Sequence, residues 1–284
     1  MPRTAQPSSQ QAGSEPSHPA PGPAAPRARR KLHLPYATIT IIGLLIVWQG
    51  ATYLFRIPAY LLPAPSEIVV DMAENWRFLL GHAKVTTFEV VVGFIFSVLV
   101  GVPLAALLTY SSAFERAVYP LIVGSNTVPK VALAPLLLAW LGFGMAPKIV
   151  IVVLVTFFPI VINSVVGLKS LPPQMLYLAR SMGTSGAQIF WLFRMPNALP
   201  SIFAGFKIAS VLSVIGAVVA EFVGADSGLG YAMMMATSDL NIARQFAAIL
   251  LLSVIGVIFF WFIAYMERLL IPWHSSIRTE ALGL

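Results

Sequence analysis

Residues 171–207 read LPPQMLYLARSMGTSGAQIFWLFRMPNALPSIFAGFK and form a polar interruption between two apolar stretches of the chain. Pro172 and Pro173 suit the first turn of a helix, where a missing N–H costs no hydrogen bond. Gly183 follows after the length of a short helix and supplies its C-terminal stop. The segment therefore begins with one short helix whose two ends are specified by the sequence.

A second short helix is predicted directly after the first. Ser185 and Gln188 have the Ser-x-x-Gln spacing of a capping box, in which each side chain binds the backbone N–H of the other residue. Pro196 and Pro200 are expected to end this helix, because proline disfavours a helix interior. Its apolar side chains are Ile189, Phe190 and Phe193. A compact helix pair over about 171–200 is poorly suited to cross a bilayer and well suited to dock a partner protein. The alternative is an amphipathic hairpin that lies on the membrane surface.

The composition of the chain is that of a membrane protein. Hydrophobic residues make up 58% and charged residues 10% of its 284 residues, and the mean hydropathy is +0.83. Apolar runs of about 20 residues recur, each long enough to cross roughly 30 Å of hydrocarbon as a helix. We predict an all-α integral membrane protein with about six transmembrane helices, over 37–55, 88–110, 118–143, 149–168, 202–222 and 246–270.

The third predicted span, 118–143, is irregular. Polar residues and prolines interrupt it, namely Asn126, Thr127, Pro129, Lys130 and Pro135. Irregular backbone at membrane depth persists only where it is buried in protein or lines a cavity. We therefore expect the 126–135 region to lie at such a place.

The net charge of +7 reflects membrane topology. If the six predicted spans alternate, basic residues dominate one side of them, at Arg27, Arg29, Arg30, Lys31, Arg116, Lys169, Arg180, Arg194, Arg268 and Arg278. Such a Lys and Arg bias marks the cytoplasmic side. We predict a multi-pass protein of a prokaryotic plasma (inner) membrane with both termini and the 171–200 segment in the cytoplasm. Because the bias accounts for the charge, no nucleic-acid partner is expected.

Three regions are expected along the chain. Residues 1–34, rich in Pro, Ala, Ser and Gln, have the composition of a disordered cytoplasmic tail. Residues 35–275 form the transmembrane domain, and 276–284 form a cytoplasmic C-terminal tail. A cleaved signal peptide is the alternative for the first span, but its apolar run is too long for a signal sequence and no convincing cleavage site follows it.

The sequence lacks the constellations that membrane enzymes need. It has no cysteine, and its four histidines have no metal-ligand spacing. It contains no Gly-x-x-x-x-Gly-Lys-Ser/Thr loop, no His-Glu-x-x-His, no Gly-x-Ser-x-Gly and no carboxylate cluster. We therefore expect no catalytic residues, no metal and no cofactor. The chain is predicted to form a transport pathway, and any energy source for transport lies on another polypeptide.

Several motifs resemble one transporter family. Arg180-Ser-Met-Gly183, followed by Gln188, Phe190, Pro196, Pro200 and Gly205, is similar to the cytoplasmic EAA loop of ABC importer permeases. The blocks at 128–144 (VPKVALAPLLLAWLGFG), 157–168 (FFPIVINSVVGL) and 221–231 (EFVGADSGLGY) resemble its nitrate/taurine/sulfonate branch, which also includes pyrimidine-precursor and riboflavin importers. The resemblance covers roughly 35–275 in matching order.

One position departs from the family motif. The acidic residue that begins the family's loop falls on Tyr177, and the next small residue falls on Leu178, so that only Ala179 is retained. A contact that needs that carboxylate cannot be carried over to this chain. What the resemblance implies is a loop that couples to an ATPase through Tyr177, Ala179, Arg180, Gly183, Ser185, Gln188, Phe190 and Pro196.

The resemblance also implies a set of partners. Two cytoplasmic ATP-binding subunits would each receive one 171–200 segment, and an extracytoplasmic substrate-binding protein would deliver the substrate. A second copy of the chain would complete the pathway in the lipid bilayer. Coupling of this kind needs a rigid element whose contacts differ between two states of the transporter.

Ionisable residues inside spans are costly and face a partner or a cavity. Lys130 lies about 18 Å along the third span, at 1.5 Å per residue. Glu89 and Glu221 are expected near the opposite membrane surface from the 171–200 segment. We predict that Lys130 pairs with one of these carboxylates and that the pair, with Asn126, borders the pathway or a gate. The alternatives are a structural ion pair that holds the irregular backbone and a lysine that extends to the membrane interface.

Other transport mechanisms remain open at this stage. An ion-gradient-driven secondary transporter would also use broken helices, but as paired repeats in two halves, and no second copy of the 126–135 irregularity is found. A channel would need a selectivity filter, and none is visible. For the substrate, the 177–183 and 221–231 stretches are more similar to carriers of pyrimidine precursors or riboflavin-like heteroaromatics than to those of sulfonates, taurine or nitrate.

Overall fold

The computed structural model describes residues 36–273, and within them every regular element is a helix. By its contacts the chain divides into two units, 1–43 and 44–284; of the first unit, only the start of α1 is described. The elements are α1 (Tyr36–Leu54), α2 (Pro65–Glu74), α3 (Trp76–Tyr110), α4 (Ser112–Asn126), the 3₁₀ helix η1 (Lys130–Leu133), α5 (Ala134–Leu141), α6 (Met145–Lys169), α7 (Pro173–Ser181), α8 (Gly186–Ile189), the π-helix η2 (Phe190–Arg194), α9 (Met195–Phe222), α10 (Leu229–Ser238) and α11 (Ile242–Leu270).

Helices occupy all six predicted spans. Among the described residues, α3, α6, the continuous helix of α8, η2 and α9, and α11 are long and apolar enough to cross a membrane. Helix α4 and the η1–α5 helix pass the same test together but are bent by 87°, so they form a broken span or a re-entrant loop. Helix α1 is a shorter apolar helix. The break falls at 127–129, which confirms the predicted irregularity of the third span.

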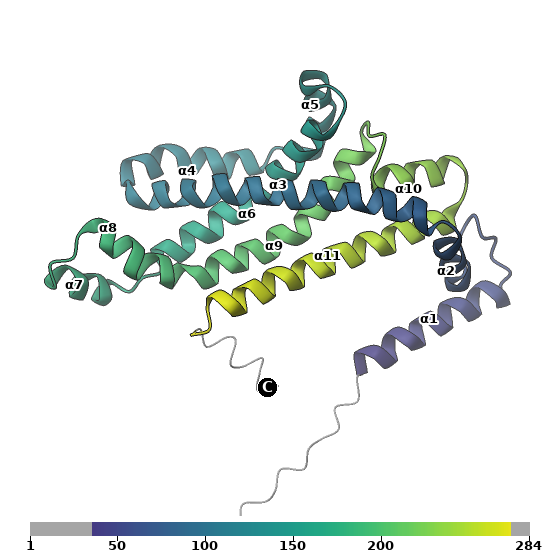
Figure 1. Cartoon of the computed structure of the whole chain (residues 1–284), viewed down its shortest axis with the longest axis horizontal. Helices are drawn as coiled ribbons and strands as arrows, with labels where there is room; N and C mark the ends of the chain where they lie inside the picture. Colours follow the sequence, from purple (N-terminus) through teal and green to yellow (C-terminus); the bar gives the residue numbers. More distant parts are fainter. Residues whose placement is uncertain (1–35, 274–284) are drawn as a thin grey trace, which may run out of the picture. The chain divides into compact units, whose positions relative to one another are not determined.

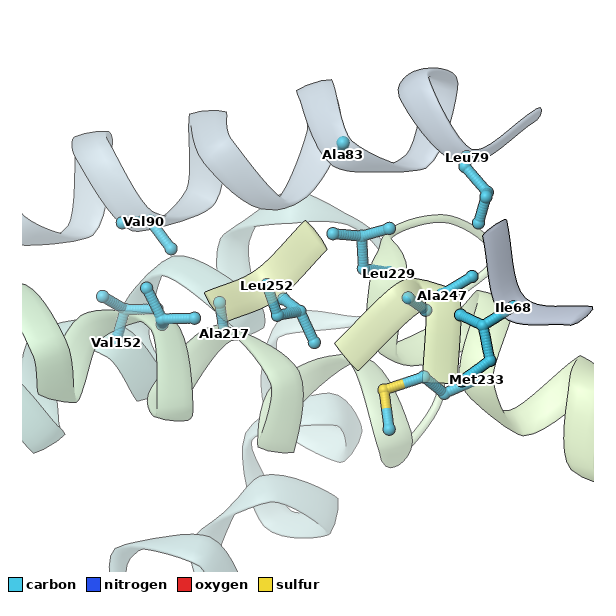
Figure 2. Packing of buried hydrophobic residues seen from close by; sticks show 12 residues of the cluster. Ile68, Leu79, Ala83, Val90, Val152, Ala217, Leu229, Met233, Ala247 and Leu252 are labelled. Carbon is cyan, nitrogen blue, oxygen red and sulfur yellow. The ribbon is translucent and has the colours of Figure 1, made fainter. Parts of the chain in front are cut away.

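Helices α3, α6, α9 and α11 run side by side in the second unit, with α7 and α8 at one end and α2 and α10 at the other (Figure 1). Small residues allow close approach: a Cβ at Gly93 would lie 2.5 Å from Val152, and Ala217 is fully buried. Helices without a hydrophobic driving force between them pack through such residues. The buried cluster near α2 and α10 contains Ile68, Leu79, Ala83, Val90, Val152, Ala217, Leu229, Met233, Ala247 and Leu252 (Figure 2).

A second apolar cluster packs the bundle near α7 and α8. It joins α3, α4, α6 and α9 through the buried residues Ala105, Leu108, Ile122, Val161, Val165, Leu168, Ala198 and Ile202. Phe190, at the start of η2, packs against this cluster. The two clusters therefore anchor the helices at both ends of the bundle.

Two predicted helix boundaries were wrong. The second span was expected to start at Phe88, but α3 starts at Trp76 because the helix continues through polar residues beyond the apolar run. Pro196 and Pro200 were expected to end the second short helix, but the chain stays helical from Gly186 to Phe222. The turn widens at η2, where the Met195 N–H bonds to the Phe190 carbonyl, and such a π turn accommodates a proline that follows it.

Candidate functional site

The caps predicted for the 171–200 segment are present. Helix α7 begins at Pro173, with Pro172 as its N-cap residue. Gly183 has φ of 77°, a left-handed conformation that only glycine adopts without strain, and it lies just past the end of α7. The Ser185 N–H donates to Gln188 Oε1 at 2.7 Å, and the Gln188 N–H donates to Ser185 Oγ at 3.3 Å. The capping box is therefore complete, and the turn between α7 and α8 is fixed at both sides.

The helix pair and the turn that follows it expose large apolar side chains. Tyr177 is 68% exposed, Met182 70% and Trp191 64%, whereas Ala179 and Ile189 are buried. Exposed apolar patches of this kind mark interaction sites. The predicted coupling residues Arg180, Gly183, Ser185 and Gln188 are also exposed, while Phe190 and Pro196 are half-buried at the junction with α9.

Polar contacts join the bundle helices where the helix pair leaves and re-enters the bundle. The Asn197 side-chain amide donates to Ser170 Oγ at 2.8 Å, and an ion pair joins Lys169 at the end of α6 to Glu115 on α4. Since α8 continues through η2 into α9, the segment is one end of a helix of 37 residues, about 55 Å long at 1.5 Å per residue. A displacement at α8 can therefore be carried along α9 to the other end of the bundle.

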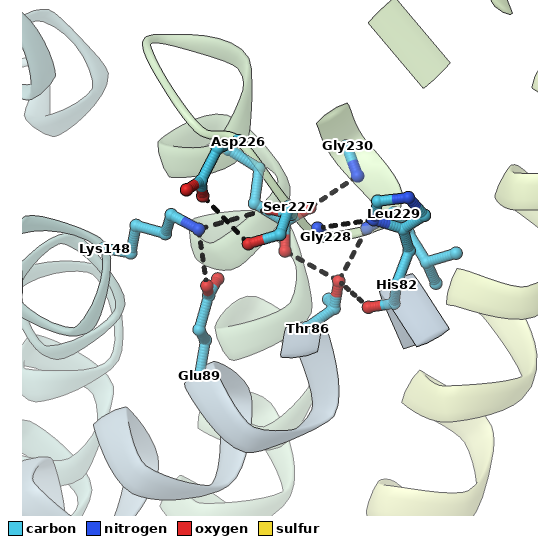
Figure 3. A network of polar contacts seen from close by, with 10 residues as sticks. His82, Thr86, Glu89, Lys148, Asp226, Ser227, Gly228, Leu229 and Gly230 are labelled. Atoms are coloured by element: carbon cyan, nitrogen blue, oxygen red, sulfur yellow. Dashed lines mark hydrogen bonds and ion pairs between the residues drawn. The ribbon is translucent and has the colours of Figure 1, made fainter. Parts of the chain in front are cut away.

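A buried polar cluster lies at that other end, between α3, α6, α9 and the turn before α10 (Figure 3). Lys148, in the first turn of α6, places Nζ 2.9 Å from Glu89 Oε1 on α3, with side-chain exposures of 4% and 0%. The same ammonium donates to the Ser227 carbonyl at 3.2 Å. One lysine therefore joins two membrane-spanning helices and the 223–228 turn.

Glu221, near the end of α9, is the second buried carboxylate of the cluster. The Thr86 hydroxyl donates to Glu221 Oε1 at 2.6 Å, and the Gly230 N–H donates to Oε2. The Leu229 N–H donates to Thr86 Oγ1 at 2.8 Å, which places the N-terminus of α10 over both side chains. Helix N-termini favour such anionic groups.

Two further residues complete the cluster. The Gly228 N–H donates to Nδ1 of His82 at 3.0 Å, so this nitrogen carries no proton. Asp226 lies on the turn at the surface, where a hydrogen bond from the Ser227 hydroxyl lowers the pKa of its carboxyl group. The turn is therefore held by α3 through His82 and Thr86 and by α6 through Lys148.

The predicted pairing of Lys130 was wrong. Its Nζ donates to Asn126 Oδ1 at 2.6 Å, one helical turn away across the break, and within residues 36–273 no ion pair involves it. The cation that pairs with Glu89 is instead Lys148, because the 87° bend turns η1 and α5 away from the direction of α4. Asn126 and Lys130 therefore lie together, but apart from the two glutamates.

Sequence reasoning missed Lys148, Thr86 and His82. Lys148 follows Gly142 and Gly144 and precedes a long apolar run, so it looked like an ordinary residue at the membrane surface. Thr86 and His82 recur at the spacing i, i+4, and Glu89 follows Thr86 at i+3, so all three share one face of α3. That spacing was the signal that could have identified the polar face of the helix.

The broken span is open to its surroundings in this chain. Asn126, Thr127, Val128 and Pro129 are all exposed, as are the large side chains Trp140 and Phe143 just beyond them. A pocket of about 410 Å³ lies beside the polar cluster and is lined in part by Glu221, Tyr231, Met235 and Asp239. Among the described residues, no group of three or more His, Cys, Asp or Glu could hold a metal ion.

Comparison with known proteins identifies relatives over most of the chain. Residues 97–272 match the family model of the binding-protein-dependent transport system inner membrane component. The formylaminopyrimidine transport permease protein ThiX of Halalkalibacterium halodurans is 37% identical over 84% of this chain and 96% of its own length. The riboflavin transport system permease protein RibX of Chloroflexus aurantiacus is 31% identical over 84% of this chain and 90% of its own length. The putative aliphatic sulfonates transport permease protein SsuC of Bacillus subtilis is 30% identical over 82% of this chain and 85% of its own length.

A solved structure has the same fold. The chain matches a protein in an inward-facing structure of the MetNI methionine ABC transporter with a TM-score of 0.62 and 20% identity. The match covers 69% of this chain and 97% of the other. At this identity the likeness concerns the fold of the helical bundle alone.

Proposed function

The chain belongs to the binding-protein-dependent transport system inner membrane components, the permease subunits of ABC importers, and we propose that it imports a small heteroaromatic molecule related to pyrimidine precursors or riboflavin. A permease subunit is itself no enzyme. The identities support the pyrimidine-precursor part of this proposal: the relative named for formylaminopyrimidine is 37% identical, whereas those named for riboflavin and, in Escherichia coli, for sulfonates and taurine are 31%, 31% and 27% identical. A sulfonate, taurine or nitrate is the competing substrate class.

The 171–200 segment is the proposed docking site for a cytoplasmic ATPase, and two such subunits would serve a pair of permeases. The observation that carries this proposal is the exposed apolar side chains of Tyr177, Met182 and Trp191 on a helix pair whose connecting turn is fixed by a capping box. Exposed apolar side chains on a surface segment mark an interaction site, and the family of the chain favours a protein partner over the membrane surface. Because α8 is continuous with α9, docking would move a membrane-spanning helix directly.

The membrane orientation follows from the same proposal. With α7 and α8 in the cytoplasm, the polar cluster and α10 lie at the extracytoplasmic surface, where a substrate-binding protein would dock. Residues 35–275 would then form the permease domain, with the regions 1–34 and 276–284 on the cytoplasmic side. Both of these terminal regions lie outside the described residues. They include the basic residues Arg27, Arg29, Arg30, Lys31 and Arg278, which contribute to the predicted cytoplasmic charge bias.

A second copy of the chain is the proposed cover for the broken span. Asn126 and the residues of the break are exposed in a single chain, yet irregular backbone at membrane depth must be buried in protein or line a cavity. Pairing of two permeases around the break would meet that requirement. Asn126 and Lys130 would then border the pathway, although they do not contact the two glutamates.

The polar cluster is proposed as the gate at the extracytoplasmic end. Glu89, Lys148 and Glu221 tie α3, α6 and α9 together at one level. Rocking of these helices against each other would have to break the ion pair or the bond from Thr86. The cluster therefore resists opening until α9 is moved from its other end.

The partner proposal is tested by recovery of the tagged chain from native membranes in mild detergent, with mass spectrometry of what accompanies it. An ATPase carrying a Gly-x-x-x-x-Gly-Lys-Ser/Thr loop is expected at about one copy per permease. Tyr177→Ala should reduce its recovery severalfold, whereas Tyr60→Ala, a tyrosine of similar exposure at 65%, should leave recovery unchanged. The substrate class is then read from binding of a pyrimidine, riboflavin, sulfonate, taurine and nitrate panel to the accompanying binding protein.

A further inference from the structure

We propose that Glu89 and Glu221 share one proton, so that the two buried carboxyl groups carry a single negative charge between them. The inference deepens the gate described above and rests on that proposed function for its role in transport. The contacts, hydrogen-bond donors and charges around the pair support a shared proton independently of transport.

The two carboxyl groups are close together and sealed from solvent. Both side chains have 0% exposure, and they lie within hydrogen-bonding reach of each other between α3 and α9. Two ionised carboxylates at such a distance repel each other strongly in a buried site, whereas one proton between them turns the contact into a hydrogen bond. The contact itself therefore favours a shared proton.

A count of donors leads to the same result. Both oxygens of Glu221 accept hydrogen bonds, from Thr86 and Gly230, and Glu89 Oε1 accepts from Lys148. Glu89 Oε2 is buried and has no donor within the described chain. An unmet buried acceptor costs about 1–3 kcal/mol, more when it is charged. A proton held between Glu89 Oε2 and the Glu221 carboxyl group supplies the missing bond.

The charged groups that face the pair do not balance two carboxylates. Of the described cations, Lys148 on α6 is the one that pairs with the cluster. On α3, His82 is neutral as long as Nδ1 accepts the Gly228 N–H. On the turn, Asp226 adds negative charge, and on α11 Arg244 is paired with Asp71. The N-terminus of α10 contributes about half a positive charge, which is already directed at Glu221.

Glycines let the backbone cover the pair directly. A Cβ at Gly228 would lie 2.2 Å from the Glu221 carboxyl carbon, and one at Gly230 would lie 2.8 Å from Oε2. The turn therefore rests on the carboxyl group without room for a side chain between them. If α3 and α9 moved apart, the two glutamates would separate and the proton would pass to water, so opening of the gate would release one proton.

Infrared spectroscopy of the full chain in lipid vesicles tests the inference. At neutral pH the wild-type protein should show the C=O stretch of a protonated carboxylic acid, and this band should shift when glutamate is isotope-labelled. Glu89→Gln and Glu221→Gln should each abolish the band, because one remaining carboxylate is balanced by Lys148 and receives a bond from the new amide. Asp71→Asn, which alters a buried carboxylate outside the cluster, should leave the band unchanged.

Two results would overturn the inference: no glutamate band in the wild type, or a band that persists in both glutamine variants. If a variant does not assemble, the spectrum of the labelled wild-type protein still tests the inference. The absence of a protonated glutamate in that spectrum would show that the two carboxyl groups do not share a proton. Failure of ATP-driven transport would overturn the proposed function without affecting the band, so the two failures are distinguishable.

Discussion

Lys148 Nζ lies 2.9 Å from Glu89 Oε1, and this buried ion pair joins the first turn of α6 to the middle of α3. The neighbouring bond from Lys148 to the Ser227 carbonyl adds the turn that leads to α10. A charge removed from water is stabilised only if its partner and its remaining hydrogen bonds are in place. The pair therefore holds the end of the bundle where three elements meet.

Replacement of Lys148 by methionine should destabilise the protein. Removing one partner of a buried pair leaves the other charge uncompensated, at a cost of about 3–5 kcal/mol. We expect a lower Tm in detergent and little assembled protein. Lys84→Met is the matched control, because Lys84 is exposed on the same helix as Glu89. Adding Glu89→Gln to Lys148→Met should restore part of the Tm; equal Tm values for Lys148→Met and Lys84→Met would contradict the pairing.

Gly228→Ala should disturb the polar cluster. The new Cβ would lie 2.2 Å from the Glu221 carboxyl carbon. The backbone at Gly228 has φ of 114° and ψ of 164°, a region essentially restricted to glycine that costs another residue about 1–3 kcal/mol before the overlap is counted. We expect reduced transport and a lower Tm. Gly256→Ala is the control, since its Cβ would meet only Val214, at an ordinary 3.7 Å. A Gly228→Ala protein with wild-type Tm would show that the turn does not cover Glu221.

The secondary structure around the 171–200 segment was predictable because its signals are local. Pro172, Gly183 and the Ser185–Gln188 box each act within one helical turn, so spacing alone determines them. The continuation of the helix past Pro196 was not predictable, because it depends on a π turn and on packing of Phe190 against α3, α4, α6 and α9. Local signals identified the helix pair but not its connection to the membrane span.

Gly183→Ala should weaken coupling between the ATPase and transport. Nothing lies within 4 Å of the new Cβ, so the effect comes from the left-handed φ of 77°, which costs alanine about 1–2 kcal/mol and would alter the turn between α7 and α8. The number of substrate molecules taken up per ATP hydrolysed should fall. Gly186→Ala, in equally open space without a positive φ, should keep the wild-type ratio. Equal ratios for both variants would contradict a role for this turn.

Lys130→Met should abolish transport and leave assembly intact. In the described chain Lys130 bonds to Asn126 across the break and takes part in no ion pair, so its loss costs little stability. The expected result is a wild-type Tm, normal ATPase recovery and no uptake. Asn126→Ala should impair uptake in the same way if both residues border the pathway. Full uptake by the Lys130→Met protein would show that Lys130 does not border the transport pathway.

The polar cluster was only partly predictable. Glu89 and Glu221 were identified because buried acidic residues in apolar spans are costly. Their partner was misassigned to Lys130, since spacing along one span carries no information about a bend of 87° between its halves. Lys148 enters the cluster through packing of α6 against α3 and α9, which only the tertiary structure reveals.

The most direct test of the account is uptake by vesicles that contain the chain together with the ATPase recovered with it and its binding protein. We predict substrate uptake that requires ATP on the membrane face that carries the ATPase. Uptake should stop when the ATPase is inactivated and should be unaffected when ion gradients are dissipated. Uptake by the chain alone, driven by an ion gradient and indifferent to ATP, would contradict the account and establish a secondary transporter.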